Sequence, residues 1–183
     1  LTLTNSNVLS NSATSGAGIL NEGPQATATV EDTEITANVA TAGGGGINNN
    51  GSFTLNRSTV SANDARSGGG IDHNGSNLAM TNVTLSGNSA SDNGGGLHSR
   101  TSSTLTNVTV SGNSASGADT GANIYVDGDS AQVTFANTIV AYPGAGGNCV
   151  NNAGSIYSAG YNLDSENSCV FIATGDLSNT DPL

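Results

Sequence analysis

The sequence has no lysine and no tryptophan, and it has three arginines against 14 acidic residues. The formal net charge is therefore −11 at pH 7. This charge argues against a nucleic-acid partner, because binding to the phosphate backbone needs clustered Lys and Arg. It also argues against binding to an anionic membrane surface. This excess of acidic over basic residues is typical of an extracellular or cell-surface protein.

Long apolar runs are missing as well. No run of 18 apolar residues occurs, so we expect no membrane insertion. No secretory signal peptide is seen in the sequence. A mature or trimmed chain would look the same, so this absence does not favour the cytoplasm.

Apolar and aromatic residues are scarce, at 34% and 4% of the chain. Globular domains contain about 45–50% apolar residues on a count that includes glycine. A low value alone would suggest disorder, but the 183 residues contain a regular repeat, which argues against it. A repeat array satisfies its backbone through stacked strands and needs fewer core residues in each unit.

The repeat is present through most of the chain. The phrase Leu-Thr-Asn-Val-Thr-Val-Ser-Gly-Asn at 105–113 returns as variants at 80–88 and 55–63. Three apolar columns follow it: Leu3, Val30, Leu55, Met80, Leu105 and Phe135; Val8, Ile35, Val60, Leu85, Val110 and Val140; and Ile19, Ile47, Ile71, Leu97, Ile124 and Cys149. The first two columns step by 27, 25, 25, 25 and 30 residues, which indicates a repeat array.

The spacing of apolar residues is that of β-strands, and it indicates which class of repeat fold the chain adopts. Thr, Val, Ser and Asn dominate, and apolar residues lie two apart, as at Val83 and Leu85. Leucine-rich repeats would need more Leu, and six-residue left-handed β-helices would have a shorter period. We therefore predict an all-β, right-handed parallel β-helix (a β-solenoid) of about six to seven coils, with two or three short strands in each and a strand spacing near 4.8 Å. The coils are expected over 1–152, and an irregular, cap-like segment of the same domain over 153–183.

One polar column accompanies the apolar ones, and Ala residues follow it two positions later, where we expect a corner. The column is expected to tolerate left-handed backbone angles and to pass amide hydrogen bonds from coil to coil, which makes it structural. Its members are Asn11, Asn38, Asn63, Asn88 and Asn113.

The two cysteines, Cys149 and Cys169, lie in the last irregular segment. We expect a disulfide across this step of 20 residues, which would require an oxidising compartment. Two free buried thiols are the alternative.

The best catalytic candidate is weak. Asp72 and His98 follow inward positions and are expected to stack, with His73 and Arg100 nearby. Glycoside hydrolysis needs paired carboxylates, and no second carboxylate shares this column. The two histidines lack the further ligands of a zinc site. We therefore expect no catalytic residues, no metal and no cofactor.

Hydroxyl side chains form an outward-facing array. Thr59, Thr84 and Thr109 stack, and Ser61, Ser86 and Ser111 follow two residues on. Such a face would suit an ice- or glycan-binding module. The preference of Thr for strands explains it equally well.

The phrases at 105–113 and 67–71 resemble the repeats of right-handed β-helix surface proteins, similar to bacterial polymorphic outer-membrane and adhesin-type proteins. The segments 147–149, 160–163, 168–169 and 175–183 resemble the end of the β-helix in the "choice-of-anchor Q" group of bacterial exported proteins. The resemblance implies export and a cell-surface or fibre role. It carries over no catalytic residues.

The expected function is that of a non-enzymatic extracellular structural β-solenoid: a stalk, an adhesin or a fibre subunit. Because the sequence starts inside the repeat phrase at Leu1, we expect either continuation in a longer chain or self-association through the coil ends. Head-to-tail contacts between copies would build filaments. A glycan- or ice-binding module is the alternative, with a surface glycan as the partner, and a polysaccharide lyase or hydrolase ranks below it.

Overall fold

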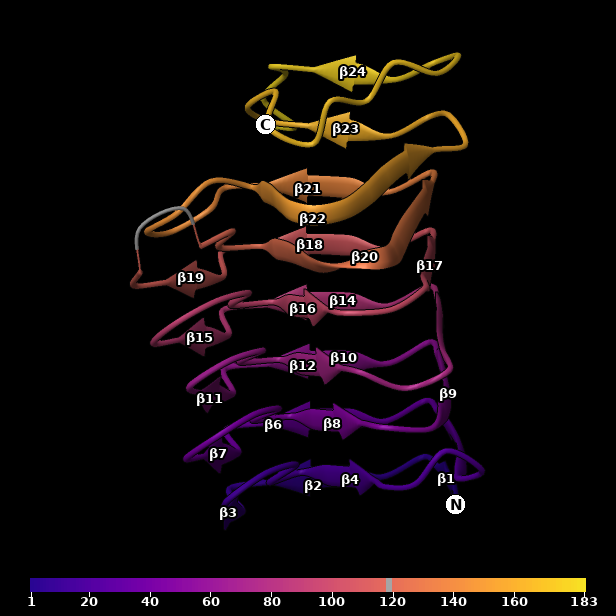
Figure 1. Cartoon of the computed structure of the whole chain (residues 1–183), viewed down its shortest axis with the longest axis vertical. Coiled ribbons are helices and arrows are strands. Elements are labelled where there is room, and N and C mark those ends of the chain that lie inside the picture. Colours follow the sequence, from indigo (N-terminus) through magenta and orange to yellow (C-terminus); the bar gives the residue numbers. More distant parts are fainter. Residues whose placement is uncertain (118–119) are drawn as a thin grey trace.

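The computed structural model describes residues 1–117 and 120–183, and these ranges form strands and no helix (Figure 1). The strands are parallel and stack in about six turns of roughly 25 residues, which confirms the predicted β-solenoid. Within the described residues no helix is long and apolar enough to cross a membrane.

Each of the first four coils contributes four short strands, which build three sheets. Sheet A follows the order β1 (Thr2–Thr4), β5 (Thr27–Glu31), β9 (Ser52–Asn56), β13 (Asn77–Thr81), β17 (Ser103–Thr106), β20 (Ile124–Ala136), β16 (Leu97–Ser99), β12 (Ile71–His73), β8 (Ile47–Asn49) and β4 (Ile19–Asn21), with β22 (Cys149–Ser158) on β20. Sheet B contains β2 (Asn7–Leu9), β6 (Glu34–Thr36), β10 (Thr59–Ser61), β14 (Thr84–Ser86), β18 (Thr109–Ser111), β21 (Ile139–Ala141), β23 (Leu163–Asp164) and β24 (Leu177–Ser178). Sheet C contains β3 (Ser12–Ala13), β7 (Val39–Ala40), β11 (Asp64–Ala65), β15 (Ser89–Ala90) and β19 (Ser114–Ala115).

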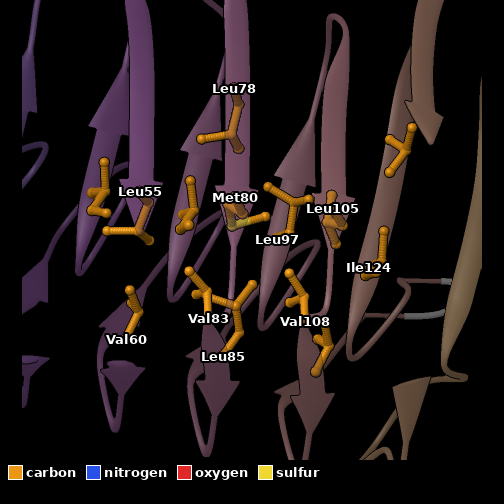
Figure 2. Packing of buried hydrophobic residues seen from close by; sticks show 14 of the residues in the cluster. Leu55, Val60, Leu78, Met80, Val83, Leu85, Leu97, Leu105, Val108 and Ile124 are labelled. Carbon is orange, nitrogen blue, oxygen red and sulfur yellow. The ribbon is translucent and has the colours of Figure 1, made fainter. Parts of the chain in front are cut away.

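The strand register brings the predicted apolar columns into line. Val60 pairs with Ile35 on one side and Leu85 on the other, and Leu85 pairs with Val110. All four side chains are fully buried. Figure 2 shows the stacked side chains filling the interior between neighbouring coils. Because a single coil cannot bury this face, each coil is stabilised by the coils next to it.

The turns differ from the expectation in one detail. The Asn column does not itself adopt left-handed backbone angles. The residue before each Asn does so, as at Ala62 with φ 52° and Gly87 with φ 62°. The turn therefore aims the following Asn side chain into the molecule, where Asn63 and Asn88 are buried.

The Ala positions after each Asn were expected to form corners. Instead, each Ala ends a two-residue strand of sheet C, and Ala65 pairs with Ala90. Small side chains are needed because the adjoining glycine loop packs closely on this sheet. A Cβ atom on Gly69 would lie 2.1 Å from the carbonyl oxygen of Ser89 in the next coil.

The C-terminal end of the solenoid is uneven. Strand β22 crosses the boundary that we expected at 152/153, and its two parts pair with the two parts of the long strand β20. Sheet B continues beyond β21 through β23 and β24. Among the described strands, sheet A has no counterpart beyond β22. The segment 153–183 therefore continues sheet B but leaves sheet A open.

Candidate functional site

Asp72, His98 and Tyr125 form one column on sheet A. They lie on β12, β16 and β20, and the register pairs Asp72 with His98 and His98 with Tyr125. Paired residues of parallel strands share one face of the sheet. The structure thus brings Asp72 and His98 together, as the sequence suggested.

Asp72 is held in a tight polar pocket. Its Oδ1 accepts a hydrogen bond from Arg100 Nη1 at 2.5 Å. Its Oδ2 lies against Gly43, where a Cβ atom would come within 2.2 Å of it. Burial raises the pKa of Asp72, and the guanidinium of Arg100 opposes this shift. Asp72 is therefore neutralised locally by its own ion pair.

His98 is 2% exposed and sits between two carboxylates. Its Nδ1 lies 3.6 Å from Asp72 Oδ1, and its Nε2 lies 3.9 Å from Asp127 Oδ2. Among the described residues neither ring nitrogen has a hydrogen-bond partner. Tyr125 packs edge-on against the imidazole, with the ring centroids 5.3 Å apart. Burial, together with the charge of Arg100, lowers the pKa of His98 to about 4 against the opposing effect of Asp127.

His73 belongs to a different environment from His98. It pairs in register with Ser99, so its side chain is on the opposite face of the sheet from Asp72 and His98. Asn49 Nδ2 lies 2.9 Å from His73 Nδ1, and His73 Nε2 lies 3.1 Å from the carbonyl oxygen of Ser102. These partners assign the proton to Nε2. Burial is the main cause that lowers the pKa of His73.

The inward corner that contains His73 is polar and changes from coil to coil. Its register column runs Asn21, Asn49, His73, Ser99 and Val126. Asn21 Nδ2 donates to Asn49 Oδ1 at 2.7 Å. The two histidines therefore do not share a site. Within residues 1–117 and 120–183, no group of three or more His, Cys, Asp or Glu side chains has the geometry to hold a metal ion.

A groove of about 330 Å³ lies beside Asp72. Arg100 and Asp72 form one ion pair in its lining, and Arg66 and Asp92 form a second, with Arg66 Nε 2.7 Å from Asp92 Oδ2. The groove thus contains two of the three arginines of the chain, each paired with a carboxylate.

Asp127, Asp92, Arg66 and Gly43 were not predicted as site residues from the sequence. Their positions in the repeat carry no unusual residue spacing, and only the stacking of loops from different coils brings them to the site. A general acid or base must reach the proton that it transfers. His98 is too buried to do so, which leaves Asp72 and Asp92 as the groove's reactive groups, and both are already paired.

We expect acid to destabilise the protein through His98. The pKa of an unfolded histidine is about 6.5, and that of His98 is about 4. Between these values the unfolded chain binds a proton that the folded chain does not. The free energy of unfolding should therefore fall as the pH drops from about 6.5 to about 4, by up to about 3 kcal/mol. The raised pKa of Asp72 opposes this loss at the acidic end.

Urea unfolding at a series of pH values measures this effect. The variant His98→Gln should show a smaller loss of stability over the same range. Part of the loss should persist in this variant, because the pKa of His73 is also lowered. A nitrogen NMR titration that places the pKa of His98 at or above 6.5 would contradict the prediction.

The Asn column forms a continuous ladder of hydrogen bonds. Asn88 Oδ1 accepts from both the backbone N–H and Nδ2 of Asn63, each at 3.0 Å. Asn88 Nδ2 donates to Asn113 Oδ1 at 2.9 Å and to the carbonyl oxygen of Val60 at 3.0 Å. Asn11 and Asn38 repeat the arrangement toward the N-terminus.

The ladder continues beyond the residues named from the sequence. Asn113 Nδ2 donates to Asn123 Oδ1 at 2.8 Å, and Asn123 Nδ2 donates to Asn148 Oδ1 at 2.6 Å. Asn148 Nδ2 then donates to Asp164 Oδ1 at 2.7 Å. Asn123 and Asn148 are 25 residues apart, but neither lies at a multiple of the repeat from Asn113, and Asp164 follows Asn148 after 16 residues. Extending the column of Asn11 to Asn113 could therefore not reveal these three residues.

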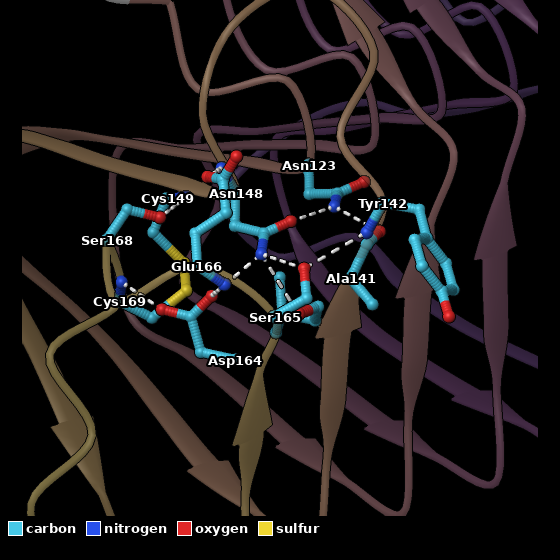
Figure 3. The surroundings of a disulfide bond; sticks show 11 residues. Asn123, Ala141, Tyr142, Asn148, Cys149, Asp164, Ser165, Glu166, Ser168 and Cys169 are labelled. Atoms are coloured by element: carbon cyan, nitrogen blue, oxygen red, sulfur yellow. Dashed lines mark hydrogen bonds between the residues drawn. A yellow bond between two sulfur atoms is a disulfide. The ribbon is translucent and has the colours of Figure 1, made fainter. Parts of the chain in front are cut away.

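The disulfide joins Cys149 to Cys169 (Figure 3). It pins the segment after β23 onto the first residue of β22. Asp164 supports the same contact, because its Oδ2 accepts from the backbone N–H of Cys169 at 2.8 Å. Ser168 Oγ accepts from the N–H of Cys149 at 3.1 Å. A disulfide is consistent with an extracellular protein.

Replacing both cysteines by serine should lower the free energy of unfolding by about 3 kcal/mol, because the bond closes a loop of 20 residues. Urea denaturation of the double variant measures this change, and reduction of the native chain serves as the matched control. A loss below about 1 kcal/mol in both experiments would contradict an entropic role for the bond.

The Thr and Ser residues of sheet B lie in register. Thr84 pairs with Thr59 and Thr109, and these side chains are half-buried. Glu34 and Ile139 occupy the same column on either side, so the Thr column is limited to three coils. The Ser column extends one coil further, because Ser61 pairs with Thr36 and their hydroxyl oxygens lie 3.1 Å apart.

Comparisons of the chain with family models, with curated proteins and with solved structures find no match. The parallel β-solenoid is therefore assigned from the strand register alone. The resemblance to adhesin-type repeats and to the "choice-of-anchor Q" group stays a prediction.

Proposed function

We propose that the protein is a non-enzymatic extracellular β-solenoid whose role is structural, as a stalk, an adhesin or a fibre subunit. The observation that carries this proposal is the Asn ladder, which runs from Asn11 to Asp164 without interruption. These side-chain hydrogen bonds, which are buried from Asn38 onward, link each coil to the next and resist axial separation. A rod stabilised along its length suits a spacer that holds another group away from a surface.

The reactive groups support a structural role over an enzymatic one. His98 is shielded from solvent, and Asp72 is bound to Arg100. The disulfide supports an oxidising compartment, where structural bonds of this kind persist.

Stretching single molecules along the solenoid axis tests the stalk directly. Coils should detach at a high, repeated force, and Asn88→Ala should lower the force for the central coils. Detachment at forces typical of a disordered chain would contradict the proposal. Incubation with acidic and neutral polysaccharides is the second arm. Release of reducing or unsaturated ends that is lost in His98→Gln would establish an enzyme instead.

The groove beside Asp72 favours one alternative, a glycan-binding module. Hydroxyl groups of a sugar can donate to a carboxylate and accept from a guanidinium at once. The two ion pairs of the groove, Asp72 with Arg100 and Asp92 with Arg66, offer both. Calorimetric titration with neutral oligosaccharides tests this function, with Arg66→Gln as the variant that should abolish any heat of binding.

A further inference from the structure

Strand β22 ends sheet A with an unpaired edge. Among the described strands it pairs only with β20, whereas sheet B continues past the same level through β23 and β24. Figure 1 shows these two strands stacked beyond β21 and β22. An unpaired edge presents a row of backbone donors and acceptors that can accept a further strand.

An apolar groove of about 450 Å³ lies along this edge. Ile156 pairs in register with the fully buried Val133, so it continues an inward column, yet it is only half-buried. Val170 and Ile172 line the groove on the segment opposite β22, and they are 64% and 88% exposed. The groove therefore lies over the end of a core column that lacks its next apolar side chain.

β22 lacks the charged residues and the proline that commonly protect an edge strand. The sequence of β22, Cys-Val-Asn-Asn-Ala-Gly-Ser-Ile-Tyr-Ser, contains no charged residue and no proline. Edge strands of monomeric proteins are commonly blocked by Lys, by Pro or by very short length. Ser168 and the disulfide cover the first residue of β22, and the register with β20 shifts around Ala153. The regular second part of the strand, residues 155–158, is therefore the part suited to pairing.

Charge defines the kind of strand that fits. From residue 101 to residue 183 the chain has no Lys or Arg and seven Asp and Glu residues. Two of these carboxylates contact β22. Asp176 accepts from Ser158 at 2.6 Å, and Asp127, on the paired strand β20, accepts from Asn152 at 3.0 Å. This negative field would attract a basic segment and repel a second copy of a chain whose net charge is −11.

We propose that β22 is a docking edge for an extended segment of a partner protein in which apolar and basic side chains alternate. The backbone of this segment pairs with β22, in the manner of strand addition to a sheet edge. Its apolar side chains enter the groove beside Ile156 and Ile172, and its basic side chains face solvent near Asp176.

Fluorescence anisotropy with labelled peptides of about eight residues, an ordinary strand length, tests the proposal. The probe alternates Val and Lys. A second peptide alternates Val and Glu, and a third has the Val/Lys sequence with methylated backbone nitrogens. We expect the first to bind the intact chain and the other two to bind at least about tenfold more weakly. Ile172→Ser should weaken the first peptide by a similar factor, while Val39→Ser, at an exposed position of sheet C, should not.

Three outcomes would overturn the proposal. Equal binding of the methylated peptide would show charge attraction without strand pairing. No binding of the Val/Lys peptide would show that the edge is closed. Sedimentation showing dimers or filaments that Ile172→Ser disperses would show that a second copy occupies the groove. Thermal unfolding of Ile172→Ser and Val39→Ser is the folding control. If both variants unfold at the same midpoint temperature as the native protein, misfolding is not the cause of any loss of peptide binding.

Discussion

Asn88→Ala is expected to lower the free energy of unfolding by about 4 kcal/mol. The change removes the acceptor for the buried backbone N–H of Asn63 and the donor for the carbonyl oxygen of Val60. Each buried group left without a partner costs about 1–3 kcal/mol, and the contact with Asn113 is lost as well. Urea denaturation followed by circular dichroism measures the change.

Asn77→Ala is the matched control, because Asn77 is exposed in the same coil. It should change the stability by less than about 0.5 kcal/mol. If Asn88→Ala and Asn77→Ala lower the free energy of unfolding by similar amounts, the hydrogen bonds of the ladder do not stabilise the protein as their geometry indicates. Hydrogen exchange should also locate the damage, with the largest loss of protection at Asn63, one coil below the substitution.

The second large effect is expected for Leu85→Ala, at about 4 kcal/mol. Leu85 is fully buried, and it is stacked between Val60 and Val110 in the register of sheet B. Truncation removes apolar contacts on both neighbours and leaves a cavity that β strands held at fixed spacing cannot close. The change is measured by the same denaturation experiment.

Leu9→Ala separates this packing effect from a loss of strand propensity. Leu9 is in the same sheet but 52% exposed, and its truncation should cost less than about 1 kcal/mol. A loss at Leu85 no larger than that at Leu9 would mean that the central column is loosely packed.

The stacked columns could be predicted from the sequence because each coil repeats the same phrase at almost constant spacing. The repeat period alone is enough to predict that Val60, Leu85 and Val110 stack. The prediction was incomplete where the hydrogen-bonding role of the Asn column moves to a different corner of the coil. The ladder leaves the repeat after Asn113 and continues through Asn123, and no fixed spacing connects the two.

The groove beside Asp72 shows a second limit. The stacking of Asp72 and His98 follows from the period, whereas the contacts of Arg66 with Asp92 and of Asp127 with His98 depend on the paths of the loops. The burial of His98 was also not predictable, because outward-facing residues of a solenoid are usually solvated. Here Tyr125 and the neighbouring loops cover it.

The changing corner column of Asn21, Asn49, His73, Ser99 and Val126 has a consequence for folding. Because the coils have nearly identical sequences, one coil can pair with its neighbour in a shifted register during folding. Such a slip would move the imidazole of His73 away from the side-chain amide of Asn49. An irregular column inside a regular rod therefore labels each coil and directs it to its proper neighbour.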